Sequence, residues 1–225
     1  MIAYSIECAV RSNLFNRVIV STDDDEIADV ARACGAEVPF RRPQELSDDH
    51  TGTAAVVAHA VEWLQKNGSD VTAACCIYAT APFIRESDLA VALAVLESRD
   101  WQYVFSATTF GFPIFRSFRL TSDASVQMFY PEHFNTRSQD LPEAMHDAGQ
   151  FYWGRARAWL DHVRIFDTRK GFFPCTANPS PQRDSGPAAR RSHAIGLPGH
   201  LLPSHAQRSA AATLPTADRG RSDRR

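Results

Sequence analysis

Charged and hydroxylated side chains follow an apolar run near the start of the chain. Val18-Ile19-Val20 ends in Ser21-Thr22-Asp23-Asp24-Asp25-Glu26, and Arg41-Arg42 and the acidic and hydroxylated run 47–53 follow soon after. This pattern predicts a buried strand that stops at a polar turn and feeds a helix, which places functional groups at the carboxyl edge of a sheet, where α/β proteins bind ligands. Guanidinium groups and a glycine at one edge suit a ligand that carries phosphate or carboxylate groups, whereas the neighbouring carboxylates would repel such a ligand unless a metal ion intervenes.

Most of these residues also have an ordinary structural explanation. Asp23 and Asp24 are candidate ligand residues, but Thr22 or Asp23 can equally cap the following helix, a role worth on the order of 1 kcal/mol. Arg42 can offer a planar guanidinium fork to a phosphate or a carboxylate, whereas an isolated surface arginine is usually solvated. Gly52 lets the backbone approach a ligand closely and also precedes a Thr cap. Both explanations stay open for each residue.

The spacing of apolar residues alternates between helical and strand periods along the chain. This alternation predicts an α/β fold with parallel strands and crossover helices, and it breaks at residues 110–149, where two paired short strands are expected. We expect helices at 2–12, 24–34, 53–66, 86–97 and 155–163, strands at 17–21, 37–39, 73–78, 103–108 and 150–154, and the short pair at 114–120 and 125–130.

Five separated motifs occur in a fixed order. They are V-I-V-S-T-D-D-D-E-I-A at 18–28, G-A-E-V-P-F-R-R-P-Q-E-L-S-D-D at 35–49, Y-A-T-A-P-F at 78–83, R-S-Q-D-L-P at 137–142 and H-D-A-G-Q-F-Y-W-G at 146–154. With these motifs the chain resembles the acylneuraminate cytidylyltransferases, which couple CTP to nine-carbon acidic sugars, and most of all the branch that acts on pseudaminic acid. The resemblance implies a Rossmann-like, mostly parallel sheet of the nucleotide-diphospho-sugar transferase (GT-A-like) type. It also implies that the insertion at about 110–149 helps to form a homodimer.

The resemblance extends to individual residues, and these are the predicted substrate contacts for CTP and the acidic sugar. Tyr78 stands where sialic-acid relatives have Gln, and Asp147 stands where they have Asn, so we expect a different nonulosonic acid as substrate. The structural alternatives to these substrate contacts are a simple strand-to-helix turn closed by Pro82 and a local pairing of His146 with Asp147. Tyr152 is expected in the core. The predicted substrate-binding set is Arg42, Asp49, Thr51, Gly52, Tyr78, Thr80, Pro82, Arg137 and Asp147, with Asp23 and Asp24 as further candidates and no catalytic residue assigned.

Two family motifs are not found in this sequence. Relatives carry a Gly-rich loop with Arg and Lys that wraps the CTP phosphates, and an Asp-Ile-Asp that holds Mg²⁺; Phe166-Asp167-Thr168 lacks the paired Asp. Mg²⁺ is therefore implied only by the resemblance, and no metal ligand is assigned. We expect a sheet truncated at its first strand and an impaired or inactive chain, because preorganised phosphate donors contribute strongly to rate. The alternative is a non-catalytic dimer partner, or pseudoenzyme, of a full-length paralogue.

The net charge of −2 over 225 residues conceals two unlike parts. Residues 1–173 form the predicted domain, whereas residues 174–225 hold eight Arg, three Asp and seven of the thirteen Pro, with no Phe, Trp, Tyr or Val. Such a segment buries too little apolar surface to offset its ordering entropy, so we expect disorder; an out-of-frame translation of a GC-rich gene also fits. Its arginines are not interleaved with aromatic residues, and this disfavours nucleic-acid binding.

The cysteine pattern and the lack of a membrane-spanning apolar window indicate the cellular compartment. Five Cys follow no disulfide or metal spacing, there is no signal segment, and no window is apolar enough to cross a membrane. We expect a cytoplasmic protein that does not bind membranes.

Overall fold

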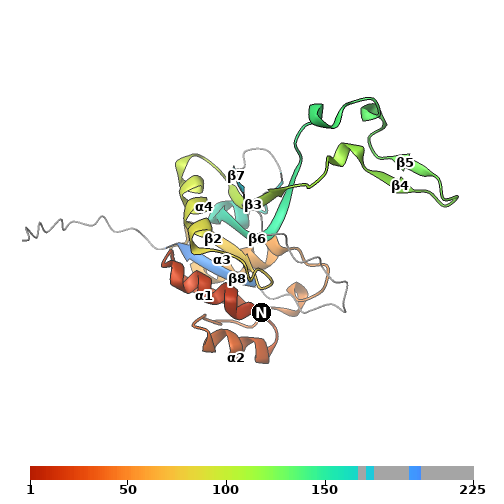
Figure 1. The fold of residues 1–225 in the computed structure, drawn as a ribbon. Helices are drawn as coiled ribbons and strands as arrows, with labels where there is room; N and C mark the ends of the chain where they lie inside the picture. The colour runs from red at the N-terminus through yellow and green to blue at the C-terminus, as the bar shows by residue number, and fades with distance from the viewer. Residues whose placement is uncertain (167–170, 175–192, 199–225) are drawn as a thin grey trace, which may run out of the picture.

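A six-stranded β-sheet forms the centre of the computed structural model, which describes residues 1–166, 171–174 and 193–198 (Figure 1). In order across the sheet the strands are β1 (Phe15–Ser21), β8 (His193–Pro198), β2 (Ala73–Tyr78), β6 (Met145–Arg155), β3 (Tyr103–Thr109) and β7 (Gly171–Pro174). The predicted α/β class is confirmed.

The expectation of a mostly parallel sheet is wrong. Among the strands that the structure describes, β3 and β7 pair in parallel, while β1 with β8, β8 with β2, β2 with β6 and β6 with β3 are all antiparallel. These pairings mean that β1, β2 and β3 run in one direction, as their connecting helices require. Strand β8 lies between β1 and β2, and β6 lies between β2 and β3, and both run in the opposite direction. Apolar periodicity identifies strands along the chain but not their neighbours in the sheet, so it could not show this.

Helices cover both faces of the sheet. The helices in chain order are α1 (Ile2–Ser12), α2 (Asp25–Ala33), α3 (Thr53–Lys66), α4 (Glu86–Ser98) and α5 (Ala156–Leu160), with a 3-10 turn at Gln44–Leu46. Residues of α1 and α4 pack with Val20, Cys75 and Trp153 in one buried cluster. Residues of α3 and α5 pack with Ile19 and Cys76 in a second cluster. Neighbouring strand residues thus alternate between two cores, as the period of a strand dictates.

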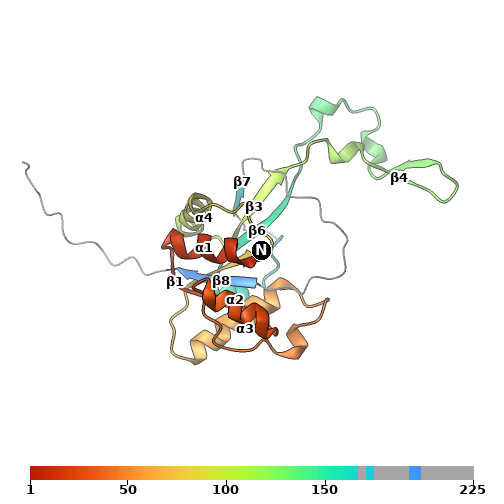
Figure 2. The same cartoon turned by 60° about the horizontal axis from the view of Figure 1, so that its bottom comes forward.

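An arm, formed by residues 110–144 between β3 and β6, projects from the sheet (Figures 1 and 2). It contains the hairpin of β4 (Phe118–Leu120) and β5 (Val126–Met128) and 3-10 turns at Ile114–Arg116, Pro131–His133 and Ser138–Asp140. Large apolar side chains on the arm are exposed, among them Phe112 (86%), Leu120 (72%) and Phe134 (68%). The arm corresponds in position to the predicted insertion.

Strand β8 belongs to the segment 174–225 that the sequence predicts to be disordered. Its residues, His-Ala-Ile-Gly-Leu-Pro, include an apolar run within that segment, and they pair on both sides with sheet strands. The rest of this segment lies outside the described residues, apart from Pro174 at the end of β7. No helix of the described part is long and apolar enough to cross a membrane.

Candidate functional site

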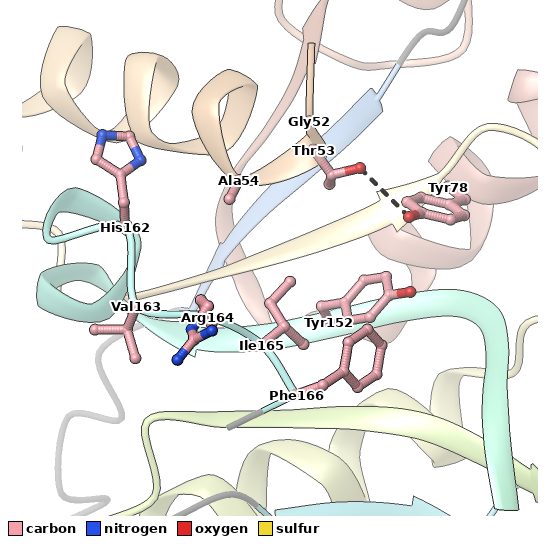
Figure 3. A pocket seen from close by; sticks show the side chains of 10 residues that line it. All are labelled: Gly52, Thr53, Ala54, Tyr78, Tyr152, His162, Val163, Arg164, Ile165 and Phe166. Atoms are coloured by element: carbon pink, nitrogen blue, oxygen red, sulfur yellow. Dashed lines mark hydrogen bonds between the residues drawn. The ribbon is translucent and has the colours of Figure 1, made fainter. Parts of the chain in front are cut away.

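A cavity of about 640 Å³ opens beside the ends of β2 and α3 (Figure 3). The start of α3, the end of β2, the middle of β6 and the segment after α5 all contribute to its wall. The lining residues are Gly52, Thr53, Ala54, Tyr78, Tyr152, His162, Val163, Arg164, Ile165 and Phe166. Because β2 ends here, the cavity lies at the carboxyl edge where the sequence predicts a ligand.

Two tyrosines carry the polar part of this wall. The Tyr78 hydroxyl lies 3.3 Å from Thr53 Oγ1, and its ring centroid is 5.5 Å from that of Tyr152 (Figure 3). The Tyr152 hydroxyl donates a hydrogen bond to Asp147 Oδ2, and Asp147 Oδ1 accepts one from the Gly149 N–H at 2.7 Å. A hydroxyl pair and an oriented carboxylate can therefore act together on a polyhydroxylated ligand.

The Tyr152 hydroxyl keeps its proton over the whole neutral range. Burial raises its pKa well above the ordinary value, and the neighbouring Tyr78 and Asp147 raise it further. A neutral phenol donates to a carboxylate, whereas a phenolate would repel it. Tyr152 thus holds the Asp147 carboxylate in one orientation, which makes it a positioning residue.

Arg42 forms hydrogen bonds with the end of β1. The guanidinium donates to the backbone oxygen of Ser21 and, at 3.2 Å, to Ser21 Oγ, while the Arg42 N–H donates to Thr22 O at 2.9 Å. The side chain is 5% exposed, and burial lowers its pKa from the ordinary arginine value. These bonds give Arg42 a definite structural role at the edge of the sheet.

The acidic turn after β1 caps a helix. Asp24 is the N-cap of α2, and its Oδ1 accepts from the N–H groups of Glu26 (2.9 Å) and Ile27 (3.1 Å). The Asp23 carbonyl accepts from Arg41, which is also ion-paired with Asp25 at 2.8 Å. The capping explanation therefore holds for Asp24 rather than for Thr22 or Asp23.

The loop before α3 is organised by Asp48. Its Oδ1 accepts from the N–H groups of His50 and Thr51 and from Thr51 Oγ1, at 2.6–2.9 Å, and these bonds, the Thr51 hydroxyl first, lower the pKa of Asp48. Asp49 is exposed and does not line the cavity. Gly52 does line it, as the N-cap of α3.

The predicted residues thus fall into two groups. Gly52 and Tyr78 line the cavity, and Asp147 is joined to it through Tyr152. Thr80 and Pro82 lie in the turn after β2, outside the cavity wall, and Arg137 lies on the arm in an ion pair with Asp140 at 2.7 Å. Within one chain the structure does not bring Arg137 to the cavity.

Sequence reasoning missed Tyr152. Phe151-Tyr152-Trp153 suggests a core strand, and Phe151 and Trp153 do lie in the α1/α4 cluster. Tyr152 points to the opposite face, and although only 3% exposed it forms part of the cavity wall. Strict strand alternation was the signal that could have separated it from its two neighbours. His146, in turn, contacts the backbone oxygen of Asp147 rather than its carboxylate.

The described residues do not supply a protein-built metal site. Among them, no three His, Cys, Asp or Glu side chains cluster in a way that could hold an ion. Asp147, the acid beside the cavity, already accepts two hydrogen bonds. The described residues therefore do not fit a Mg²⁺ ion bound by their side chains alone.

Comparison with known proteins identifies the lineage. The model of the family named "Cytidylyltransferase" matches residues 1–176. This chain belongs to the cytidylyltransferase family. A pseudaminic acid cytidylyltransferase of Campylobacter jejuni subsp. jejuni serotype O:2 is 42% identical over 178 residues, which are 79% of this chain and 77% of that protein. The predicted resemblance to the pseudaminic acid branch is confirmed.

A second relative agrees with the family assignment, and one solved structure shares the fold. A Helicobacter pylori protein named as both pseudaminic acid cytidylyltransferase and UDP-2,4-diacetamido-2,4,6-trideoxy-beta-L-altropyranose hydrolase is 38% identical over 74% of this chain and 32% of its own length. A CMP:2-keto-3-deoxy-manno-octonic acid synthetase, solved with CTP, shares the fold with a TM-score of 0.50 at 14% identity, over 77% of this chain and 79% of its own.

Proposed function

We propose that this cytidylyltransferase-family chain transfers CMP from CTP to an acidic nine-carbon sugar, pseudaminic acid or a close relative, and releases pyrophosphate. The observation that carries the proposal is the cavity at the carboxyl edge of the sheet, with Tyr78, Tyr152 and Asp147 beside it, in a chain 42% identical to a pseudaminic acid cytidylyltransferase. A cytoplasmic location is part of the proposal, because CTP is a cytoplasmic nucleotide.

In this reaction an anomeric hydroxyl of the sugar attacks the α-phosphorus of CTP, and the bond to pyrophosphate breaks. The protein has mainly to hold the attacking oxygen in line with the leaving pyrophosphate and to stabilise the charge of the phosphates, because little covalent chemistry falls to it. Asp147, held by Tyr152 and the Gly149 N–H, accepts hydrogen bonds from sugar hydroxyl or amide groups. The Thr53 and Tyr78 hydroxyls, which line the same cavity, bind hydroxyl groups of the same substrate.

The N-terminus of α3 suits the anionic part of the substrates. Gly52 and Thr53 bring the first backbone N–H groups of a 14-residue helix to the cavity, where they favour a negative charge. Gly52 has no atom within 4 Å of the Cβ that another residue would add, so a ligand can approach its backbone closely.

We further propose that the arm joins two copies into a homodimer. Its Phe112, Leu120 and Phe134 side chains are exposed and apolar, and a second copy would cover them. The arm would then carry Arg137 towards the cavity of the other copy, where its guanidinium suits the sugar carboxylate. A Phe112→Ser, Phe134→Ser double variant should elute as a monomer in light-scattering chromatography; an unchanged mass would count against this interface.

The experiment for the proposed function supplies CTP, Mg²⁺ and pseudaminic acid, and follows pyrophosphate and the CMP-sugar by mass spectrometry. N-acetylneuraminic acid serves as the competing acceptor, and Asp147→Ala as the control variant. CMP-pseudaminic acid formed by the native chain and reduced in the variant supports the proposal. A chain that neither turns over nor binds CTP, and that co-purifies with a full-length paralogue, supports instead the non-catalytic dimer partner; binding without turnover indicates an impaired enzyme.

A further inference from the structure

Strand β6 contains a wide bulge where it pairs with β3. The register between the two strands shifts between Phe105 and Ala107 of β3, so residues 148–151 of β6 lie opposite the single residue Ser106. Bulges bend a strand and re-aim its side chains, and they are frequent beside active sites. This bulge separates the two β6 side chains that are hydrogen-bonded to each other beside the cavity.

The bulge decides on which face of the sheet Asp147 lies. Successive side chains of a regular strand point to opposite faces, so Asp147 and Tyr152, an odd number of positions apart, would lie on opposite faces. In the bulged strand they pair with Ala107 and Phe105, which are two positions apart on β3 and share a face. The Tyr152 hydroxyl therefore reaches Asp147 Oδ2. Without the bulge, Asp147 would leave the Tyr152 side of the sheet.

The hydroxyl of Ser106 closes the bulge. Its Oγ accepts hydrogen bonds from the backbone N–H groups of Gln150 and Phe151, each at 3.4 Å. A hydroxyl oxygen has two lone pairs and can serve both donors, whereas an alanine side chain can serve neither. The Ser106 side chain is 0% exposed, so water cannot readily take its place as the acceptor.

Gly149 turns the backbone inside the bulge. Its φ of 64° lies in the left-handed region, which glycine adopts without steric cost. Its N–H donates to Asp147 Oδ1 at 2.7 Å. The bulge is thus held by Ser106 at one end and orients the Asp147 carboxylate at the other.

We propose that Ser106 is a positioning residue for Asp147: by closing the bulge in β6, its hydroxyl keeps the carboxylate on the cavity side of the sheet, where it selects the hydroxyl and amide donors of an acidic sugar. Ser106 is buried and is not among the residues that line the cavity, so it acts through Asp147. The identity of the ligand rests on the proposed function, whereas the role of Ser106 in the bulge does not.

Amide hydrogen exchange of the native chain and of Ser106→Ala tests the geometry without a ligand. Loss of the acceptor should loosen the bulge, so the Gly149 amide should exchange about tenfold faster in the variant. Tyr103→Phe is the matched control, because it removes another buried hydroxyl from β3 and should leave this amide unchanged. An unchanged Gly149 amide in Ser106→Ala, or equal acceleration in both variants, would overturn the proposal.

Titration with pseudaminic acid tests the route through Asp147. Ser106→Ala should weaken sugar binding about 5-fold in the native background but less than about twofold in the Asp147→Ala background, because the carboxylate that it positions is then absent. Equal weakening in both backgrounds would show a merely structural role and refute the positioning role. If the native chain did not bind the sugar, the proposed function would fail, and the exchange of the Gly149 amide would still decide whether Ser106 holds the bulge.

Two further comparisons apply even if Ser106→Ala does not fold. Ser106→Thr keeps a hydroxyl, so its sugar affinity and Gly149 exchange should lie closer to the native values than those of Ser106→Ala. Gly149→Asn tolerates the positive φ that strains Gly149→Ala, so it should bind the sugar more tightly than Gly149→Ala does. The proposal would be contradicted if Ser106→Thr behaved as Ser106→Ala does, or if the two Gly149 variants bound the sugar equally.

Discussion

Removal of one hydroxyl group, by Tyr152→Phe, separates a site role of Tyr152 from a packing role. The ring remains, so the packing against Phe105 and Tyr78 is kept, while the hydrogen bonds of the hydroxyl with Asp147 and with Tyr78 are lost. A hydrogen bond to a charged group contributes roughly 1.5–3 kcal/mol. Asp147 is only half-buried and keeps the Gly149 N–H, so water can replace part of the loss, and about 1–2 kcal/mol is expected.

That free energy corresponds to about 5-fold to 30-fold weaker binding of the acidic sugar, at 1.4 kcal/mol per factor of ten. The affinity for CTP should stay the same, since the proposed role of the Asp147 carboxylate is to bind the sugar. Titration calorimetry with each ligand measures both quantities, whatever the turnover rate. The melting temperature should fall by about 2–8 °C.

The matched control is Tyr103→Phe. Tyr103 is also buried, and its hydroxyl donates to Ala158 O at 2.8 Å, away from the cavity wall. This variant should lose stability yet bind the sugar as the native chain does. If Tyr152→Phe bound the sugar within twofold of the native affinity, or if both variants lost it equally, the positioning role of Tyr152 would be refuted.

Three further outcomes follow from the core. Gly154→Ala should destabilise the chain by about 1–3 kcal/mol or more in urea unfolding, because a Cβ there would lie 2.5 Å from Trp159 Nε1 and 2.7 Å from Tyr103; a native midpoint would contradict the packing. Burial raises the pKa of Cys8 to about 11, above its unfolded pKa of ~9. The contribution of the protonated thiol to stability is therefore present below pH ~9 and is lost as the pH rises through 11. The urea midpoints at pH 8 and pH 11 should differ less in Cys8→Ala than in the native chain. Burial lowers the pKa of His59, so stability present above pH ~6.5 should fall as the pH drops, and His59→Leu should lose this pH dependence in melts between pH 5 and 7.5.

The sequence predicts most elements of the fold because local periodicity determines them. The helices at 2–12 and 53–66 and the strand at 73–78 occur at the predicted residues, whereas the expected strand at 37–39 is a single bridge between Glu37 and Ile19. The order of strands depends on pairing between distant residues, and the reversed positions of β6 and β8 followed from no local pattern.

The candidate site was predictable where a motif coincides with the end of an element. Gly52 and Tyr78 lie at the start of α3 and the end of β2, so their place in the cavity followed from topology. The place of Tyr152 in the cavity wall could not be predicted because the residue lies in an apolar run. Arg164 and Phe166 also line the cavity, but they follow α5 in a segment without a distinctive sequence pattern. Arg42, which the sequence singles out for ligand chemistry, is buried and hydrogen-bonded to Ser21, and its contact with a ligand stays a prediction.

The central claim is that the cavity beside Tyr78, Tyr152 and Asp147 is where an acidic sugar receives CMP. The most direct measurement is single-turnover mass spectrometry of the native chain and of Asp147→Ala with CTP, Mg²⁺ and pseudaminic acid. The account predicts CMP-pseudaminic acid from the native chain and at least about tenfold less from the variant, since loss of an oriented charged hydrogen-bond partner costs 1.5 kcal/mol or more. Equal product from both proteins would contradict it.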